Sequence, residues 1–382
     1  MKVLSPKGVT LHRRPTSAII DRSALRHNYL EIKKRTTPGT KVMAVVKANA
    51  YGHGDVQVAR VFESAGCEFF GVAIPEEGAR LRQAGIKAPV VVLGGIFPEQ
   101  APELFDLDLT PVIYDMETAR LVNGLAVKMG VRKKMHLKVD TGMGRLGIKP
   151  GEVAPFLREF RSLKGLELEG VLSHLAEADS LKREFSETQL ELFNETLRTV
   201  REDCGFEPAL VHMANSAAVV DLADSRFNLV RPGIMLYGSY PSERFRGKID
   251  LKPAMQIKTR ILYLKSVAAG SPVSYGRTFV AGRPSRIATL PIGYADGLPR
   301  RLSGSGEVLV KGKRVPIVGL VCMDLTMCDV TDVEGVETGD EVVVLGAQGS
   351  EAITAEEIAE RAGTISYEIF CNISGRVPRV YI

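Results

Sequence analysis

The chain has 382 residues, of which 45% are hydrophobic, 25% charged and 6% aromatic, and this mixture excludes a disordered, fibrous or coiled-coil protein. The formal net charge is +5, and the basic residues are scattered rather than gathered into a stripe with aromatic residues, so no nucleic-acid partner is expected. The length suits two domains.

Cysteine usage and the N-terminus indicate the compartment. The spacing of the five cysteines predicts neither a disulfide framework nor a zinc or other metal site. The N-terminal sequence, MKVLSPKGVTLHRRP, has no apolar signal-peptide core, because Pro6 and Lys7 interrupt it. No apolar stretch approaches the ~20 residues that a membrane span needs. We therefore expect a reduced, cytoplasmic protein without a membrane partner.

From about residue 40, short runs rich in β-branched residues alternate with longer stretches of helical periodicity. The expected strands are, in chain order, 40–47, 68–74, 89–95, 107–113, 134–140, 166–174, 208–214 and 227–233. Strands that are apolar on both sides and alternate with helices indicate a parallel sheet covered on both faces. Eight such units are the number that closes a (β/α)8 barrel, and a doubly wound open sheet is the alternative.

After about residue 245 the pattern changes to β-rich runs separated by Gly, Pro and Asp turns. In this part only TAEEIAERAG (354–363) is predicted to be a helix. The expected α/β organisation is an N-terminal (β/α)8 TIM-type barrel over 1–245 and a C-terminal mainly-β domain over 246–382. The extreme N-terminal segment is allowed to pack with the second domain.

The polar residues at the strand ends are candidates for chemistry, because the active site of such a barrel lies where strands end and loops begin. In chain order they are Lys47, Asp140, His174, His212 with Ser216, and Arg231. A lysine that ends an apolar strand is unfavourable unless it is paired or used covalently. Taken alone, Lys47 is equally well explained as a snorkelling or ion-paired lysine, but the converging partners weaken that explanation.

A cofactor follows from this arrangement. A nearly buried lysine with a lowered pKa forms a Schiff base with an aldehyde. The loops after the seventh and eighth strands, around Asn215-Ser216 and Pro232-Gly233, can cradle a phosphate. These features together predict pyridoxal 5'-phosphate (PLP) and carbanion chemistry on an amino acid.

One motif is typical of a different class of protein. Gly142-Met-Gly144-Arg-Leu-Gly147 is a literal G-x-G-x-x-G after a strand, as in dinucleotide-binding folds. It follows the fifth predicted strand rather than the first, and Pro150-Gly151 comes directly after it, so we expect no long helix to open there. A nicotinamide-dependent oxidoreductase is therefore disfavoured.

The chain resembles the alanine racemase family of fold-type III PLP enzymes over essentially its whole length. The motifs that carry the resemblance occur in the family's order: AVVKANAYGHG, KVDTGMGRLG, HMANSAA, RPGIMLYG, VSYGRTF, LPIGYADG, VCMDLTMCDVT and SYEIFCNISGRVPRVY. The resemblance implies an isomerase that interconverts L- and D-alanine and supplies D-alanine for cell-wall peptidoglycan. It also implies a head-to-tail homodimer with shared active sites.

The resemblance further implies roles for single residues. Lys47 resembles the Schiff-base lysine and one catalytic base, and Tyr275 resembles the opposite base, contributed by the other subunit. The residues expected around the cofactor are Lys47, Tyr51, His174, Ser216, Arg231, Gly233, Ile234 and Tyr367, with Arg231 facing the pyridine nitrogen. Arg145 and the partner subunit's Met323 resemble groups around the substrate carboxylate.

Two further residues resemble supporting groups. Lys138 resembles a lysine that is often carbamylated in this family and then holds Arg145, and Asp324 resembles a gate residue of the partner loop. Without the family pattern, Lys138 would be a plain ion pair. Tyr275 would then be a core tyrosine with a satisfied hydroxyl, and for His174 a core histidine with satisfied polar atoms would be an equally good interpretation.

Racemisation removes a proton from one face of Cα and returns it on the other, so two bases should flank the cofactor plane. An arginine at the pyridine nitrogen donates but does not accept a proton, which leaves the ring a weaker electron sink and suppresses side reactions. Three alternatives stay open: a racemase for serine or broader side chains, a fold-type III amino-acid decarboxylase, and a non-catalytic PLP-carrier protein.

Overall fold

The computed structural model describes residues 3–4, 10–11 and 14–382, with side chains from residue 14 onward. The chain forms two compact units. One, here called the barrel unit, is Ala24–Lys252. The other, here called the sheet unit, joins the N-terminal residues up to Ser23 with Pro253–Ile382.

The barrel unit is built on eight strands that pair in the order β10-β9-β8-β7-β6-β5-β4-β11, with every ladder parallel. Their bounds are β4 (Lys41–Val45), β5 (Phe69–Val72), β6 (Val90–Val92), β7 (Leu109–Ile113), β8 (Lys133–Lys138), β9 (Leu166–Leu172), β10 (Leu210–His212) and β11 (Leu229–Val230). Each predicted run overlaps one of these strands. The last strand returns to the first, so the barrel is confirmed and the open sheet is wrong.

Side chains and loops complete the ring between β10 and β11. Asn228 Oδ1 accepts a hydrogen bond from the Val211 backbone N–H (2.7 Å), and Asn228 Nδ2 donates one to the Ala209 carbonyl (2.8 Å). Beyond the strands, the Arg231 N–H donates to the Ala214 carbonyl (2.9 Å). One amide thus makes the two bonds that a backbone ladder would make.

We expect Asn228→Ala to lower the free energy of unfolding by about 1–2 kcal/mol, since each net hydrogen bond contributes about 1 kcal/mol. Denaturant titration of the two proteins measures the difference. The matched control is Asn194→Ala, on the exposed face of α8, which should change stability by less than about 0.5 kcal/mol. Equal effects of the two substitutions would show that Asn228 does not close the ring.

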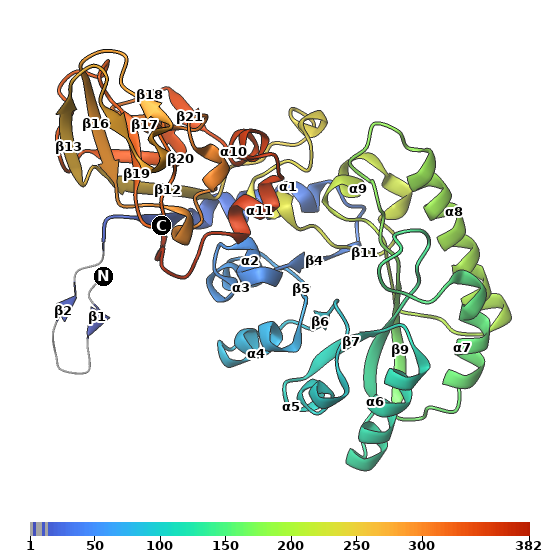
Figure 1. Ribbon diagram of the computed structural model, residues 1–382. Coiled ribbons are helices and arrows are strands. Elements are labelled where there is room, and N and C mark those ends of the chain that lie inside the picture. Colours follow the sequence, from blue (N-terminus) through green and yellow to red (C-terminus); the bar gives the residue numbers. More distant parts are fainter. Residues whose placement is uncertain (1–2, 5–9, 12–13) are drawn as a thin grey trace. The chain divides into compact units, whose positions relative to one another are not determined.

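Helices connect the strands and lie around their outside (Figure 1). They are α1 (Arg22–Lys34), α3 (Asp55–Ser64), α4 (Pro75–Gln83), α5 (Glu103–Asp106), α6 (Met116–Met129), α7 (Val153–Phe160), α8 (Glu184–Arg198) and α9 (Ser216–Asp221). Their ends follow local rules. For α6, the Asp115 carboxylate caps the first turn by accepting from the Thr118 N–H (2.7 Å), and Gly130 ends the helix at φ 68°.

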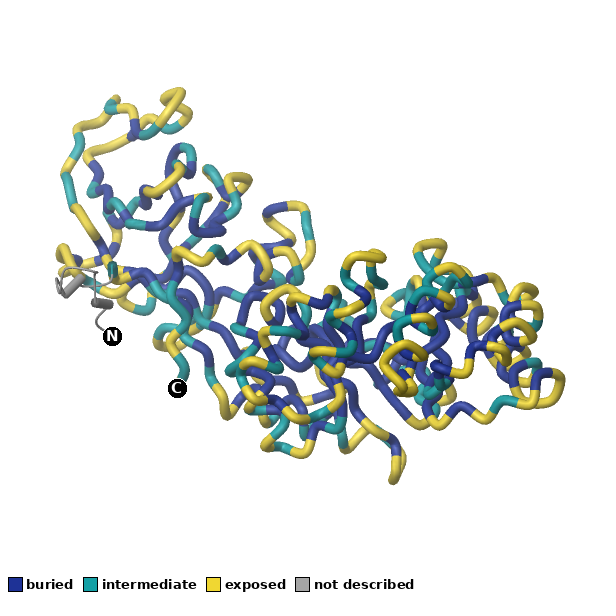
Figure 2. The backbone as a smooth tube through the Cα atoms, turned by 90° about the horizontal axis from the view of Figure 1, so that it is seen from below, coloured by how far each residue is buried: buried dark blue, intermediate teal, exposed yellow. Residues whose placement is uncertain are grey.

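An apolar cluster fills the barrel interior. Its buried members come one each from β4, β5, β6, β7, β9, β10 and β11: Met43, Phe69, Val91, Val112, Leu172, Leu210 and Leu229. The seven side chains are at most 6% exposed, and Figure 2 shows buried stretches of the backbone alternating with exposed ones. Such a filled interior makes the barrel a packed core, so functional groups have to sit at its ends.

The sheet unit is mainly β, as predicted. Its largest sheet has the order β18-β17-β20-β12-β3-β22, and smaller sheets are β13-β16-β19, β14-β15 and β1-β2. The bounds are β1 (Val3–Leu4), β2 (Thr10–Leu11), β3 (Ser17–Ile20), β12 (Met255–Arg260), β13 (Tyr263–Val267), β14 (Pro272–Val273), β15 (Phe279–Val280), β16 (Ser285–Leu290), β17 (Glu307–Val310), β18 (Lys313–Pro316), β19 (Thr326–Asp329), β20 (Glu341–Gln348), β21 (Glu351–Ile353) and β22 (Arg379–Tyr381). The N-terminal strand β3 pairs with β12 and β22, so it completes this sheet.

The helices of the sheet unit differ from the prediction. The predicted helix is present as α10 (Ala355–Ala362), but a second helix, α11 (Ser366–Cys371), follows it, so the prediction of a single helix was wrong. Six residues with a mixed aromatic and β-branched sequence carry little helical signal, and buried Ile369 and Phe370 hold the turn by packing. None of the described helices is both long and apolar enough to cross a bilayer.

Candidate active site

Lys47 opens a turn of unusual backbone conformation. It begins α2 (Lys47–Tyr51), directly after β4, and the next four residues, 48–51, all have φ between 51° and 55°. The buried Glu77 carboxylate holds this left-handed turn by accepting hydrogen bonds from the N–H groups of Ala48 (2.6 Å) and Ala73 (2.7 Å). Such conformations cost ~1–3 kcal/mol each and concentrate at functional sites, and here the turn fixes where the half-buried Lys47 starts.

Hydroxyl and backbone groups meet beside this turn. The Gly233 N–H donates to the Ser216 hydroxyl at 2.8 Å, and both residues are buried. The Tyr51 hydroxyl lies so close that a Cβ at position 233 would be 2.4 Å from it, so any residue larger than glycine would displace this hydroxyl. Ile234 follows and is fully buried. Two neutral hydroxyls and a glycine backbone form the kind of cradle that a phosphate group occupies.

Arg231 makes several buried hydrogen bonds at these strand ends. It is 5% exposed, and its Nη1 donates to His212 Nδ1 at 2.8 Å. Its Nη2 donates to the carbonyls of Ser173 (2.6 Å) and Met213 (3.2 Å) and to His174 Nδ1 (3.2 Å). Burial lowers the pKa of Arg231 to about 9, which still leaves it charged at neutral pH. The guanidinium is therefore a fixed, buried positive charge.

The predicted cationic residues converge at this end of the barrel. Burial, together with the charges of Arg231, Arg145 and Lys47, lowers the pKa of Lys138 to about 8, although Asp140 opposes the shift. For His174, burial and the same cations depress the pKa well below its usual value, so the ring is neutral. This surplus of positive charge suits an anion such as a phosphate or carboxylate.

The G-x-G-x-x-G loop folds around a carboxylate of its own chain. Asp140 accepts hydrogen bonds from the N–H groups of Gly142 (3.0 Å) and Gly144 (2.9 Å), and Arg145 is exposed on this loop. No long helix opens at the motif, as expected: a 3-10 turn at Pro150–Glu152 comes first, and it leads into the eight-residue helix α7. Proline is compatible with the first turn of a helix.

Tyr275 belongs to the sheet unit and is 71% exposed, so the interpretation as a core tyrosine is wrong. It begins a short 3-10 turn, Tyr275–Arg277, flanked by positive φ at Ser274 (69°) and Arg277 (51°). The Ser274 hydroxyl donates to the Leu320 carbonyl at 2.7 Å. The turn is thus tied to the loop that carries Met323.

The remaining predicted residues also lie in the sheet unit. Met323 is 53% exposed, and its carbonyl accepts from the Ala295 N–H at 3.0 Å. The exposed Asp324 carboxylate accepts from Arg376 Nη2 at 2.7 Å. Tyr367 is half-buried on α11. The structure therefore gathers Tyr275, Met323 and Asp324 on neighbouring loops of one unit, and Lys47 and Arg231 on the other.

Two buried residues with polar contacts to this site escaped the sequence analysis: Glu77, which holds the Lys47 turn, and His136. A third, His212, was named as a strand-end candidate but without a role. Glu77 lies in a charged helical stretch with nothing to distinguish it. His136 stands between Met135 and Leu137 in a predicted strand, and that position was the available signal.

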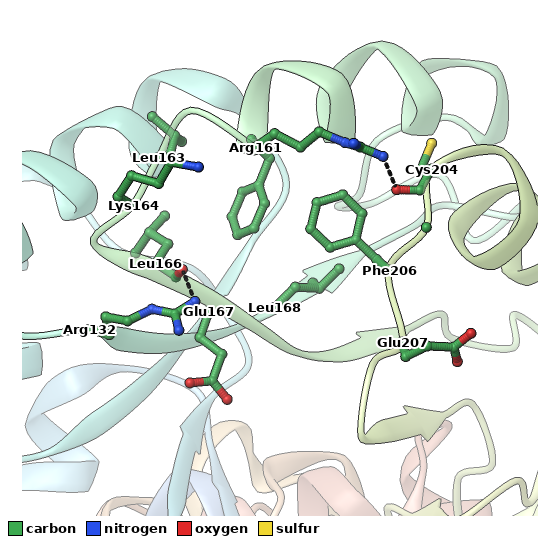
Figure 3. Close-up of a pocket in the computed structure, with 12 residues that line it drawn as sticks. Arg132, Arg161, Leu163, Lys164, Leu166, Glu167, Leu168, Cys204, Phe206 and Glu207 are labelled. Carbon is green, nitrogen blue, oxygen red and sulfur yellow. Dashed lines mark hydrogen bonds between the residues drawn. The ribbon is translucent and has the colours of Figure 1, made fainter.

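A pocket of about 740 Å3 lies at the opposite end of the barrel (Figure 3). Its lining residues stand before strands rather than after them: Arg132 precedes β8, Leu166 begins β9 and Glu207 precedes β10. The Arg161 guanidinium donates to the Cys204 carbonyl across it. The candidate active-site residues of the barrel unit lie at or after the carboxyl ends of their strands, so this pocket is not part of that site.

Known protein families and relatives match this chain over nearly its whole length. Residues 20–241 match the family model "Alanine racemase, N-terminal domain", and residues 254–381 match "Alanine racemase, C-terminal domain". An alanine racemase of Halothermothrix orenii is 48% identical over 368 residues, which cover 96% of this chain and 97% of that protein.

Two solved structures are similar in fold as well. Alanine racemase from Bacillus anthracis with bound L-Ala-P has a TM-score of 0.92 and 39% identity, over 97% of this chain and 96% of that one. Alanine racemase from Bartonella henselae with covalently bound pyridoxal phosphate has a TM-score of 0.87 and 32% identity, over 96% and 99%.

Proposed function

Because the chain belongs to the alanine racemase family, we propose that it binds PLP through Lys47 and interconverts L- and D-alanine. The observation that carries the proposal is the convergence of Lys47, the hydroxyl cradle and the buried Arg231 at the carboxyl ends of the barrel strands. When bound, PLP supplies the electron sink that acidifies the Cα–H of an amino acid.

The residues present fit this cofactor. Tyr51, Ser216 and the backbone at Gly233 and Ile234 would hold the phosphate, and Tyr367 would complete its shell. Arg231 would face the pyridine nitrogen. Since its donors to Ser173 and Met213 fix the guanidinium, it can present only N–H groups to that nitrogen.

The proton transfers are assigned to two residues. Lys47 would act on one face of the substrate Cα and Tyr275 on the other. A tyrosine needs a nearby positive charge to act well below its ordinary pKa of ~10. Arg231 would supply that charge. The neutral His174 would lie between Arg231 and Tyr275, since His174 Nδ1 accepts a hydrogen bond from Arg231 and its Nε2 carries the proton.

We further propose a cytoplasmic homodimer in which each active site combines Lys47 of one subunit with the partner subunit's Tyr275, Met323 and Asp324. The exposure of Tyr275 and Met323 supports this, because on their own unit both side chains face outward. Arg145 and the partner subunit's Met323 would then border the substrate carboxylate. The expected product, D-alanine, would serve cell-wall peptidoglycan.

The test is spectroscopic and chemical. The purified protein should be yellow, borohydride should attach the cofactor to Lys47, and circular dichroism should follow the loss of optical rotation of L-alanine. Labelling of a different lysine would overturn the assignment of Lys47. Comparable rates on serine or larger amino acids would indicate a broader racemase, CO2 release a decarboxylase, and bound PLP without turnover a carrier protein.

Lys138 provides a separate prediction. With a pKa of about 8, roughly half of its amines are neutral at pH 8, against under about 1% for an ordinary lysine, and only a neutral amine captures CO2. Its carbamate would meet Arg145 and Arg231. We expect a carbamate signal from 13C-bicarbonate in NMR spectra that weakens as the pH falls below 8 and disappears in Lys138→Arg.

Lys133 is the matched control for this prediction. It is buried on the same strand, but its Nζ lies 3.3 Å from the Asp108 carboxylate, which would repel a carbamate. Lys133→Arg should therefore keep the signal. A signal that survives Lys138→Arg would refute carbamylation at Lys138.

A further inference from the structure

A line of hydrogen bonds runs from Arg231 through the barrel to its surface. Arg231 Nη1 donates to His212 Nδ1 at 2.8 Å, and His212 Nε2 lies 2.9 Å from His136 Nδ1. His136 Nε2 lies 3.2 Å from one oxygen of Glu169, whose other oxygen pairs with the exposed Lys134 ammonium at 2.7 Å. Four side chains thus connect the candidate active site to the outside.

The chemistry of the two ends sets the direction of every proton. A guanidinium only donates, so His212 Nδ1 accepts and its Nε2 carries the hydrogen. His136 Nδ1 then accepts from His212, and His136 Nε2 donates to the Glu169 carboxylate, which only accepts. With both histidines neutral, a single arrangement satisfies all of these atoms.

The histidines occupy an apolar layer. His136 is in register with Val112, and His212 with Leu172, and both of these partners belong to the interior cluster. Since residues in register share a face of the sheet, the histidines also point inward, and both are 0% exposed. Two imidazoles in such a layer are costly unless every polar atom is paired.

The backbone of β9 is adapted to this arrangement. The register with β8 shifts between Met135, which pairs with Leu168, and His136, which pairs with Gly170, so Glu169 is the extra residue of a bulge. Bulges of this kind redirect a side chain, and they recur beside active sites. At Gly170 a Cβ would be 2.9 Å from the His136 ring, so glycine leaves the space that the ring fills.

The charges are consistent with these proton positions. Burial lowers the pKa of His212 well below its usual value, and Arg231 and His136 lower it further. Burial also lowers the pKa of His136, although Glu169 opposes this. Burial raises the pKa of Glu169, but hydrogen bonds from His136 and Lys134 lower it to about 2.

We propose that Glu169, acting through His136 and His212, is a positioning residue for the active site: it fixes the proton positions of both imidazoles and thereby the orientation of Arg231. The effect on catalysis rests on the proposed function, but the proton positions do not. Because none of these three residues touches the substrate, the expected consequence is a change in rate and cofactor spectrum rather than in substrate affinity.

The first test uses the holoenzyme labelled with 15N-histidine. The chain has six histidines. NMR should show the imidazoles of His136 and His212, assigned by the loss of their signals in His136→Asn and His212→Asn, as neutral rings with the hydrogen on Nε2, unchanged from pH 6 to 9. A hydrogen on Nδ1 of either ring, or a charged ring at neutral pH, overturns the proposal whether or not the enzyme racemises alanine.

The second test compares variants at Glu169. Glu169→Leu removes the acceptor and should lower kcat about tenfold, with KM unchanged, while shifting the cofactor absorption band and the His136 resonances. Glu169→Gln keeps an acceptor and should stay within about threefold of wild type. Glu167→Leu, two residues earlier on β9, is the matched control and should change neither spectrum nor kcat.

The two variants together decide the matter. Wild-type kcat and proton positions in Glu169→Leu would refute the proposal. If Glu169→Leu does not fold, Gly170→Ala takes its place, because the added Cβ displaces the His136 ring without removing a charge. If the wild-type enzyme has the expected proton positions but does not racemise alanine, that result would count against the proposed function only.

Discussion

Mixing two inactive variants, Lys47→Ala and Tyr275→Ala, is expected to restore about a quarter of wild-type racemase activity. In a dimer with shared sites, one site of the mixed dimer inherits both defects, and the other receives Lys47 from one chain and Tyr275 from the other. Equal mixing makes about half of the dimers mixed, each with one intact site of two. Activity is measured by circular dichroism after subunit exchange.

The control is each variant exchanged with itself, which should stay inactive. If both residues came from the same chain, every site would carry a defect and no activity would return. A mixture that stays inactive after mass spectrometry has confirmed exchange would rule out the shared site. The barrel and its strand-end cluster would be unaffected by that result, because they lie within one unit.

Replacing Arg231 with glutamate is expected to keep PLP bound but to lower kcat for racemisation at least about a hundredfold and to produce pyruvate by transamination. Arg231 presents only N–H donors, whereas a carboxylate would favour a protonated pyridine and a stronger electron sink. Circular dichroism gives the racemisation rate, and a coupled assay gives pyruvate.

Arg231→Lys is the matched variant for this experiment. It keeps a positive donor but loses the fork that bonds Ser173 and Met213, so it should be slower than wild type without forming pyruvate. Unchanged kinetics in Arg231→Glu would mean that the guanidinium does not face the ring. Pyruvate from both variants would mean that the positive charge is not what suppresses transamination.

The strand runs of the barrel were predictable because their signal is local. Continuous apolar, β-branched runs between helical stretches require only a few neighbouring residues to be recognised. The same periodicity placed Lys47 and Arg231 at strand ends, and the family motifs supplied their roles. Pro150 was also a local signal, since a 3-10 turn begins at it and no long helix opens at the glycine motif before it.

Contacts between distant segments were beyond local rules. His136 and His212 are 76 positions apart, and their ring contact exists only because β8 and β10 both flank β9. The bulge that redirects Glu169 depends on the register of two strands, which a single strand does not reveal. Tyr275 carried no sign of its exposure, because a tyrosine in a β-rich stretch is as common in a core as on a surface.

The amino-acid sequence alone therefore established the two-part architecture, the cofactor and the residues at the strand ends, since these follow from periodicity and short motifs. The tertiary structure decided which groups touch, where the protons of the histidine pair lie and which side chains face outward. The physical reason is that burial and hydrogen-bond partners depend on strand register and packing, which are set by segments far apart in the chain.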